Sequence, residues 1–370
     1  MTKVNILSSN RFHLLDLARE LSSNGFDVKF YSFVPNRRAV KYGLSHQCSK
    51  SLVILLAPFL VLARVLFKRK LWAENLLMLV QDFLTARLMR KSDVCIALSG
   101  RYVCALRKAR RDGAYVIVER GSMHVLEQAR ILDSISSCRI RPISFHIQRE
   151  LASYALADKI SIPAQHVQES FLWQGFKQDQ LLVNPYGVNL QMFYIEPQAT
   201  KQYDVLMVGN WSYRKGCDLI NSVLESSNLT FLHVGSIGDL SIPEHPRFTH
   251  VDSVDESKLV KYYNRAKIFV LPSREEGFGM VLIQAVACNL PIVAGKNTGG
   301  NDLKKMVDQP QYITIMDECS PQCLSRSIDK AMSDYKHLNP NEPYAGKGIE
   351  NISWAAYGRR YAHNIRELLK

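Results

Sequence analysis

The chain lacks the sequence features that mark several large protein classes. Its eight cysteines form no CxxC pair and no ladder of metal ligands, which disfavours a disulfide framework and a zinc module. It has no low-complexity segment and no short-period repeat. No signal peptide is expected, because residues 1–7 already read as a strand. We therefore expect a folded protein of the reducing cytosol.

One apolar segment suggests contact with a membrane, although it is too short to span one. Residues 51–63 are uncharged over 13 positions and include Pro58, whereas a spanning helix needs about 20 apolar residues. Arg64, Lys68, Arg69 and Lys70 follow directly. This pattern predicts a helix in the headgroup region of an anionic bilayer; a core helix with a solvated basic end is the alternative.

The excess of positive charge lies in the first half of the chain. Residues 1–180 hold 27 lysines and arginines against 14 aspartates and glutamates, whereas residues 181–370 hold 20 of each. A basic half implies a negative partner, such as anionic lipid, a phosphorylated acceptor or nucleic acid. Because no zinc-finger spacing, RNP-like strand or basic heptad region is present, we expect no nucleic acid. The charge favours the membrane interpretation of residues 51–70.

Strand and helix patterns alternate along the whole chain, which predicts the α/β class with parallel sheets. A chain of 370 residues is long enough for two domains, and the alternation restarts after residues 185–190. We expect two doubly wound, Rossmann-like domains at 1–184 and 185–352, followed by a helix at 353–370. Ligands of such sheets bind at the carboxyl ends of the strands, so a cleft between the domains is the expected site.

Residues 268–294 read as a strand, a glycine-rich turn, a helix and a second strand. The turn places Glu276 beside Gly277 and Gly279, where the helix begins. Glycines leave backbone N–H groups uncovered, and a helix N-terminus carries about half a positive charge. This combination suits a phosphate joined to a hydroxyl-rich group, as in a nucleotide sugar. A plain strand-to-helix turn is the alternative.

A basic pair follows the first strand of the second half. Gly209 ends that strand, and Arg214 and Lys215 precede the next helix. An arginine offers a fork that matches phosphate oxygens, and a lysine supplies a compact charge. An exposed pair on a loop is the alternative.

The two motifs together resemble the retaining GT-B glycosyltransferases of family 4 (glycosyl transferases group 1). Residues 272–279 match the donor-site signature Pro-Ser-x-x-Glu-Gly-Phe-Gly, and residues 214–216 match its basic pair. The resemblance implies a nucleotide-sugar donor, a glycan or lipid-linked acceptor, and a C-terminal helix that returns to the first domain. It implies that Arg214 and Lys215 stabilise the leaving diphosphate and that Glu276 contacts sugar hydroxyls.

The resemblance also implies a donor-binding set with two departures from the family pattern. Gln284 replaces a glutamate that binds ribose, and Asn210 stands where many relatives have arginine. Glutamine keeps an acceptor oxygen, so ribose binding can survive, and altered nucleotide choice is the alternative. The expected donor-binding residues are Gly209, Asn210, Gly277, Phe278, Gly279, Met280 and Gln284.

In the first half, the loop after residues 115–118 carries Arg120 and His124. The resemblance places His124 near the donor sugar as a catalytic residue, although a lone loop histidine is more often a surface residue. Arg120 could meet an acidic acceptor. Arg11 and His13 follow the first strand, where relatives often have two glycines, and are acceptor-side candidates only.

The resulting hypothesis is a hexosyltransferase of cell-surface polysaccharide synthesis (lipopolysaccharide, capsule or exopolysaccharide). We expect it in the cytoplasm, peripheral on the inner face of the plasma membrane. The chain shows no metal-ligand cluster and no Asp-x-Asp motif, so we expect neither metal nor cofactor. The alternatives are a GT-B epimerase or inverting transferase, or a non-catalytic membrane- or anion-binding scaffold, which Gln284 and Asn210 keep open.

Overall fold

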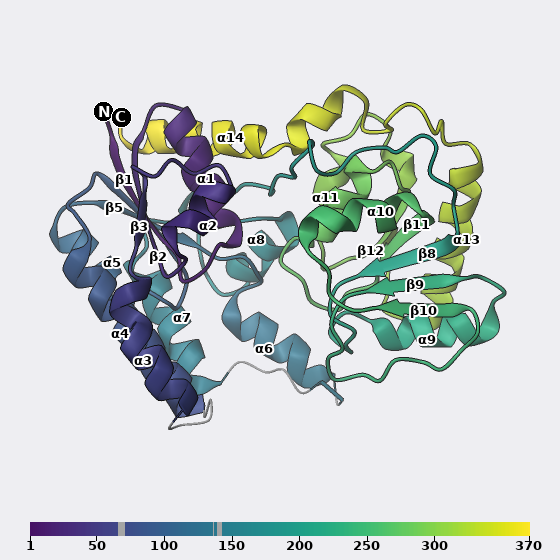
Figure 1. Ribbon diagram of the computed structural model, residues 1–370, viewed down its shortest axis with the longest axis horizontal. Helices are drawn as coiled ribbons and strands as arrows, with labels where there is room; N and C mark the ends of the chain where they lie inside the picture. The colour runs from purple at the N-terminus through teal and green to yellow at the C-terminus, as the bar shows by residue number, and fades with distance from the viewer. Residues whose placement is uncertain (66–70, 136, 139–142) are drawn as a thin grey trace.

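The computed structural model describes residues 1–65, 71–135, 137–138 and 143–370, with residues 60–65 and 71 described by their backbone alone. Two α/β lobes stand side by side, and the chain crosses from one to the other after residue 183 and again at the C-terminal helix (Figure 1). The carboxyl ends of the strands in both lobes face the region between them, as the sequence predicts.

The first lobe is built on a parallel sheet of seven strands in the order β3-β2-β1-β4-β5-β6-β7. Its central strands are nearly continuous apolar runs, because helices cover both faces. The strands are β1 (Lys3–Leu7), β2 (Asp27–Ser32), β3 (Ser49–Ser51), β4 (Val94–Leu98), β5 (Tyr115–Glu119), β6 (Lys159–Ile162) and β7 (Leu181–Val183). The helices are α1 (Phe12–Ser23), α2 (Asn36–Lys41), α3 (Val53–Val65), α4 (Leu71–Leu88), α5 (Val103–Arg111), α6 (Val125–Ser134), α7 (Ser144–Leu156) and α8 (Gln165–Leu172).

The second lobe repeats the plan with a parallel sheet of six strands in the order β10-β9-β8-β11-β12-β13. The strands are β8 (Tyr203–Val208), β9 (Phe231–Val234), β10 (Phe248–Val251), β11 (Ala266–Leu271), β12 (Ile292–Gly295) and β13 (Ile313–Met316). The helices are α9 (Cys217–Ser226), α10 (Leu259–Asn264), α11 (Met280–Ala287), α12 (Gly300–Lys304), α13 (Pro321–Lys336) and α14 (Trp354–Leu368). The expected α/β class with two doubly wound parallel sheets is confirmed.

The C-terminal helix α14 returns to the first lobe, also as expected (Figure 1). It packs on α1 so closely that a Cβ on Gly358 would lie 2.2 Å from the Cβ of Glu20. Tyr361 donates its hydroxyl to Oε1 of Glu119 at the end of β5, over 2.7 Å. The tail of the chain therefore belongs to the core of the first lobe.

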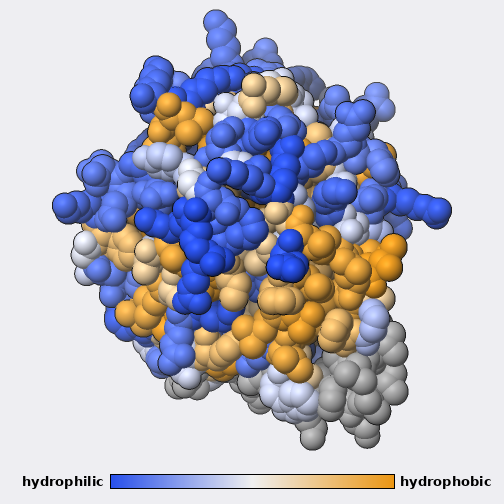
Figure 2. All heavy atoms as spheres, turned by 90° about the vertical axis from the view of Figure 1, so that its left-hand side faces the viewer, coloured by the Kyte–Doolittle hydropathy of each residue, from blue (hydrophilic) through white to orange (hydrophobic). Residues whose placement is uncertain are grey.

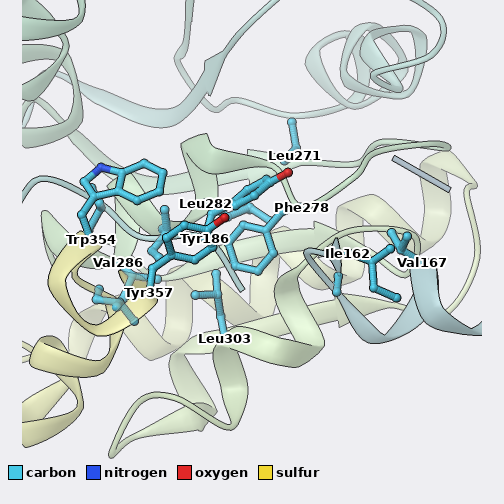
Figure 3. Packing of buried hydrophobic residues seen from close by; sticks show 14 of the residues in the cluster. Ile162, Val167, Tyr186, Leu271, Phe278, Leu282, Val286, Leu303, Trp354 and Tyr357 are labelled. Atoms are coloured by element: carbon cyan, nitrogen blue, oxygen red, sulfur yellow. The ribbon is translucent and has the colours of Figure 1, made fainter. Parts of the chain in front are cut away.

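An aromatic cluster joins the lobes beneath the cleft. The ring of Tyr186, just beyond the first sheet, lies edge-on to Phe278 of the second lobe, with centroids 5.8 Å apart. Tyr357 of α14 lies edge-on to the same tyrosine at 6.0 Å. Figure 3 shows these rings packed together above Leu303 of α12. Phe278 is thus a buried packing residue, 1% exposed, although the sequence placed it among the donor-binding residues.

The loop expected after β5 is present at residues 120–124, but the helix α6 that follows it from Val125 was not predicted. His124 is the N-cap of this helix, and its Nδ1 accepts a hydrogen bond from the Leu126 N–H over 3.4 Å. Histidine is an uncommon N-cap, so the sequence gives little sign of a helix start. Short elements were missed as well: β3, α2, β10, α12 and β13.

The helices α3 and α4 form a hairpin with an unusually apolar outer surface. On α3, Ile54 is 83% exposed, and on α4 Phe83 is 63% exposed. Leu52 and Leu56 of the same segment are buried beside Phe33, so the described side chains of residues 51–59 have one face packed inward and one face exposed. Arg64, Lys68, Arg69 and Lys70 of the predicted basic end lie outside the described side chains. No helix among the described residues has both the length and the apolar character needed to cross a membrane.

Candidate active site

The basic pair lies against the signature turn at the carboxyl ends of the neighbouring strands β8 and β11. Gly216 fixes this approach: it has a φ of +72°, and a Cβ there would lie 2.2 Å from the carbonyl oxygen of Pro272. A side chain at this position would push the two loops apart. Arg214 and Lys215 are therefore held directly opposite residues 275 and 276.

Each cation of the pair meets its own carboxylate. Arg214 donates from Nη1 to Oε2 of Glu275 over 3.1 Å, and Lys215 Nζ donates to Oε2 of Glu276. Burial alone would raise the pKa of Glu276, but Lys215 and Arg214 act more strongly in the other direction, and the pKa is lowered. Glu276 is thus ionised at neutral pH and can accept hydrogen bonds from hydroxyl groups.

The helix α11 opens directly behind this carboxylate. Its N-cap, Gly279, has a left-handed backbone with a φ of +81°, and no described side chain caps the first turn. The first N–H groups of an α-helix have no partner within the helix, and they attract anions. The site therefore combines two cations, one ionised carboxylate and a helix N-terminus, which suits a phosphate attached to a polyhydroxyl group.

Glu275 links the two lobes, and the sequence reasoning did not select it. Its side chain is fully buried, and it accepts hydrogen bonds from Ser122 Oγ and, over 3.2 Å, from Gln128 Nε2, both in the first lobe. With Arg214 as its third partner, Glu275 joins the basic pair to α6. The sequence did carry one sign of its importance. Glu275 lies beside Glu276 in the signature turn, and each of two adjacent carboxylates needs a partner of its own.

The lobes can lie this close together only because residue 277 is a glycine. A Cβ on this residue would lie 1.7 Å from the carbonyl oxygen of Gly121. On the same side, His166 of α8 donates from Nε2 to the carbonyl oxygen of Glu276 over 2.9 Å. The signature turn is thus held by backbone contacts as well as by charges.

The other residues expected to bind the donor already make some hydrogen bonds within the protein. Gln284 lies on α11, where its Oε1 accepts the hydroxyl of Tyr263 over 2.9 Å, while its amide nitrogen has no hydrogen-bond partner in the described part of the chain. Asn210 donates to Ser236 Oγ over 2.9 Å. Gly209 ends β8, with its carbonyl bonded to the ring of His233. Met280 is the first residue of α11.

His124 is buried within the first lobe. Its ring is 2% exposed and packs in an aromatic cluster with Tyr154, Phe171 and Phe176. Burial, followed by the charge of Arg120, lowers the pKa of His124 to about 4. The imidazole is therefore neutral at physiological pH, and its catalytic role stays a prediction.

The remaining first-lobe candidates all contact carboxylates. Arg120 is 8% exposed and donates to Glu150 Oε1 and Gln128 Oε1, each over 2.8 Å. Arg11 spans the cleft to Glu256 over 2.8 Å. His13 Nε2 lies 2.9 Å from Glu119 Oε2, and its ring stacks obliquely on Tyr186.

No group of three or more potential metal ligands occurs among the described residues. The eight cysteines all lie in the described part of the chain, and none of them forms a disulfide there. The expectation of a reaction without metal or cofactor stays a prediction.

Known proteins resemble the second lobe in sequence. Residues 191–347 match the family model described as glycosyl transferases group 1. Sucrose-phosphate synthase 1 of Arabidopsis thaliana is 30% identical over 168 residues, which cover 43% of this chain and 15% of that protein. A component of phosphatidylinositol N-acetylglucosaminyltransferase from the same plant is 22% identical over 253 residues, covering 61% of this chain and 55% of that component. The chain thus spans only about 15% of the length of the sucrose-phosphate synthases that it matches.

Solved structures resemble the whole chain. Sucrose-phosphate synthase from Thermosynechococcus elongatus superposes with a TM-score of 0.66 at 16% identity, covering 100% of this chain and 99% of the other. Anabaena HepE in complex with UDP and glucose gives 0.66 at 12% identity, covering 99% of this chain and 100% of the other. At such identities the likeness concerns the fold. The chain has the GT-B fold, and residues 191–347 carry the sequence pattern of the group 1 glycosyl transferases.

Proposed function

We propose that the protein is a retaining glycosyltransferase of family 4 that moves a hexose from a nucleotide sugar to a hydroxyl group of a glycan or lipid-linked acceptor. The observation that carries this proposal is the meeting of Arg214 and Lys215 with the signature turn at the N-terminus of α11. The sequence match of this lobe and the GT-B fold of the whole chain support the same reaction class.

The proposed mechanism is electrostatic. The bond between the anomeric carbon and the diphosphate oxygen breaks, and the electron pair stays on the diphosphate. Arg214, Lys215 and the amides of α11 stabilise the charge that develops there, in a site where water is largely excluded. The acceptor hydroxyl attacks from the same face, and its proton passes to the departing diphosphate. Glu276 binds hydroxyls of the transferred sugar.

The ion pairs of the site have a consequence for donor binding. Before the donor arrives, Glu275 and Glu276 neutralise the two cations. A bound diphosphate would pair with Lys215 in place of Glu276, and sugar hydroxyls would bind Glu276 in place of Lys215. Donor binding therefore exchanges one buried ion pair for another set of partners, which limits the desolvation cost. The amide nitrogen of Gln284, which has no partner among the described residues, remains available to a ribose hydroxyl.

The apolar surface of the α3–α4 hairpin supports an acceptor at a membrane. Trp72, Leu76, Leu79 and Phe83 follow one another at helical spacing on α4, and all are at least 40% exposed. Ile54, Leu55 and Phe59 extend this surface onto α3. Figure 2, which faces the first lobe, shows one continuous apolar area on this side. A patch of this kind marks an interaction surface, and the net charge of the first half favours anionic lipid.

We place the reaction in cell-surface polysaccharide synthesis, at the inner face of the plasma membrane. The apolar hairpin, the basic first half and the resemblance to the family 4 glycosyltransferases support this assignment. The eight cysteines, which form no disulfide in the described structure, fit a reducing compartment.

A thermal-shift series with UDP-, GDP-, ADP- and CMP-sugars tests the proposal. A transferase is stabilised by its own donor, whereas a non-catalytic scaffold shows no stabilisation by any of them. The anomeric configuration of the product, read by NMR, then separates a retaining enzyme from an inverting one, and an epimerase would convert the nucleotide sugar without an acceptor.

A further inference from the structure

A second pocket lies between the lobes, apart from the basic pair. It has a volume of about 730 Å³ and is bounded by α8 of the first lobe and by the β12–α12 region of the second. Neither Arg214 nor Lys215 lines it. Its volume falls in the range of small-molecule sites, which often lie at domain interfaces.

The side chains that line this pocket include several without partners. Trp173, directly after α8, is 66% exposed, and its indole makes no hydrogen bond or ring contact within the described part of the chain. The side chains of Lys296, Lys304 and Asn301 likewise make no hydrogen bond or ion pair with any described residue. An exposed aromatic ring beside polar side chains that only water satisfies is a combination common in ligand sites.

The chemistry of the lining matches a sugar ring. The face of Trp173 offers a flat apolar surface for the C–H face of a pyranose, as aromatic walls do in ligand sites. Sugar hydroxyls both donate and accept hydrogen bonds. The carboxylate of Glu169 can accept from them, and the ammonium group of Lys296 can donate to them. A purely anionic ligand would face Glu169 and Asp302, and a purely apolar ligand would leave the lysines unpaired.

One residue of the pocket lining, His166, also contacts the signature turn. His166 lines the pocket and donates to the carbonyl oxygen of Glu276, so its Nε2 carries the proton and its Nδ1 is an acceptor. That Nδ1 is buried and has no hydrogen-bond partner in the described part of the chain, and the same holds for Oδ2 of Asp302. Neither atom is exposed in this arrangement of the lobes, so the exposed side chains of the lining are the ones that a ligand meets first.

Both lobes contribute to the pocket, and two contacts cross it. Asp302 Oδ1 accepts the backbone N–H of Gln165 over 3.0 Å, and Lys305 Nζ donates to Oε1 of Gln165 over 2.7 Å. A ligand held here therefore touches both lobes in their closed arrangement. It also contacts His166, which donates to the carbonyl oxygen of Glu276.

We propose that this pocket is a saccharide subsite that holds a sugar unit of the acceptor glycan, remote from the hydroxyl that reacts. The proposal rests on the proposed transferase function, since the growing glycan is the sugar chain that such an enzyme meets. Binding at Trp173 and contact with the signature turn through His166 would favour closure of the lobes around a correctly placed acceptor.

The test measures saccharide binding directly, without donor or transfer. Saturation-transfer NMR with maltotriose and cellotriose, each at millimolar concentration, is compared for the wild type, Trp173→Ala and Trp72→Ala. Trp72 is also exposed, at 49%, but lies on α4 outside the pocket. We expect signals from at least one trisaccharide with the wild type and with Trp72→Ala, and at least a fivefold loss with Trp173→Ala. We also expect Asn301→Ala, at an exposed position, to lower the saturation-transfer signal at least twofold.

Equal signals from the wild type and Trp173→Ala would overturn the subsite, as would the absence of signal from both sugars. The nucleotide-sugar thermal shift of Trp173→Ala separates this result from failure of the proposed function. If the donor stabilises that variant as it does the wild type while the saccharide signal is lost, the donor site and the subsite are distinct. If the donor stabilises neither protein, the transferase function fails, whatever the trisaccharides show.

Discussion

Arg214 and Glu275 form a hydrogen-bonded ion pair of 3.1 Å in which the carboxylate is fully buried and the guanidinium borders the candidate donor site. Because Ser122 and Gln128 of the first lobe hold the same carboxylate, the position of Arg214 depends on contact between the lobes. Glu275 is in this sense a positioning residue for the arginine.

The first prediction concerns this carboxylate. Glu275→Gln keeps the shape of the side chain but removes the charge that orients Arg214. A hydrogen bond to a charged group contributes about 1.5–3 kcal/mol, so we expect kcat to fall about tenfold or more, with a smaller change in KM for the donor. Steady-state kinetics measure this split. A wild-type kcat in this variant would show that Arg214 does not need the buried partner.

The second prediction concerns Lys215. Lys215→Ala removes a cation that faces the developing diphosphate charge, and losing one such group typically costs about 10²–10³ in rate. Lys330→Ala is the matched control, because Lys330 is exposed on α13 and pairs only with Asp334 and a nearby carbonyl among the described residues. Near-normal transfer by Lys215→Ala, with the melting temperature unchanged, would contradict the electrostatic mechanism.

The third prediction concerns closure of the cleft. In Gly277→Ala the new methyl group would fall 1.7 Å from the Gly121 carbonyl oxygen, so the lobes must separate. We expect a larger radius of gyration by small-angle X-ray scattering and loss of most transfer activity, while each lobe stays folded by circular dichroism. Gly113→Ala is the control for backbone strain without a clash, because its φ is +83° and a Cβ there meets no atom within 4 Å, whereas Gly277 has no positive φ. An unchanged radius in Gly277→Ala would show that the lobes do not close in solution as they do here.

The sequence predicts the fold well because the strands are long apolar runs with helical patterns between them. It also predicts that residues 214–215 and 276 face the same cleft, since each follows a strand and ligands bind at the carboxyl ends of such strands. That the two strands, β8 and β11, are neighbours is seen only in the structure. It does not predict the part played by Glu275, because partners from residues 122 and 128 become neighbours only when the lobes close. Likewise, nothing in the local pattern shows that His124 caps a helix inside an aromatic cluster, since its ring partners are 30 to 52 residues away.

The fourth prediction concerns the apolar hairpin. Replacing Leu79 and Phe83 together by serine removes apolar surface from the exposed face of α4 without touching the core. Each such side chain contributes about 1.5–3 kcal/mol when fully buried, and less at a lipid surface. We expect at least a tenfold weaker association with phosphatidylglycerol vesicles in co-sedimentation, and wild-type binding for Ile237→Ser, an exposed apolar residue of the second lobe. Equal sedimentation of all three proteins would exclude the hairpin as the membrane contact.

The fifth prediction is a pH dependence of stability that originates at His124. Its pKa is about 4 in the folded protein, below the ordinary value of about 6.5, because the ring is buried. Below pH 6.5 the His124 ring is protonated in the unfolded chain, whereas in the folded protein it stays neutral until about pH 4. The contribution of this residue to the free energy of unfolding is therefore fully present above pH 6.5 and is lost between pH 6.5 and pH 4.

His124→Asn isolates this effect, because asparagine is a favoured N-cap that can still accept the Leu126 N–H but does not titrate. Unfolding midpoints in urea at pH 7.5, 6.5, 5.5 and 4.5 should decline less steeply for this variant than for the wild type. Some decline must persist, because burial also lowers the pKa of His233 to about 4. Identical pH profiles for the two proteins would mean that the His124 ring reaches solvent in the folded state. A ring that faces the cleft, as a catalytic residue would, would then fit better than a ring buried in the aromatic cluster.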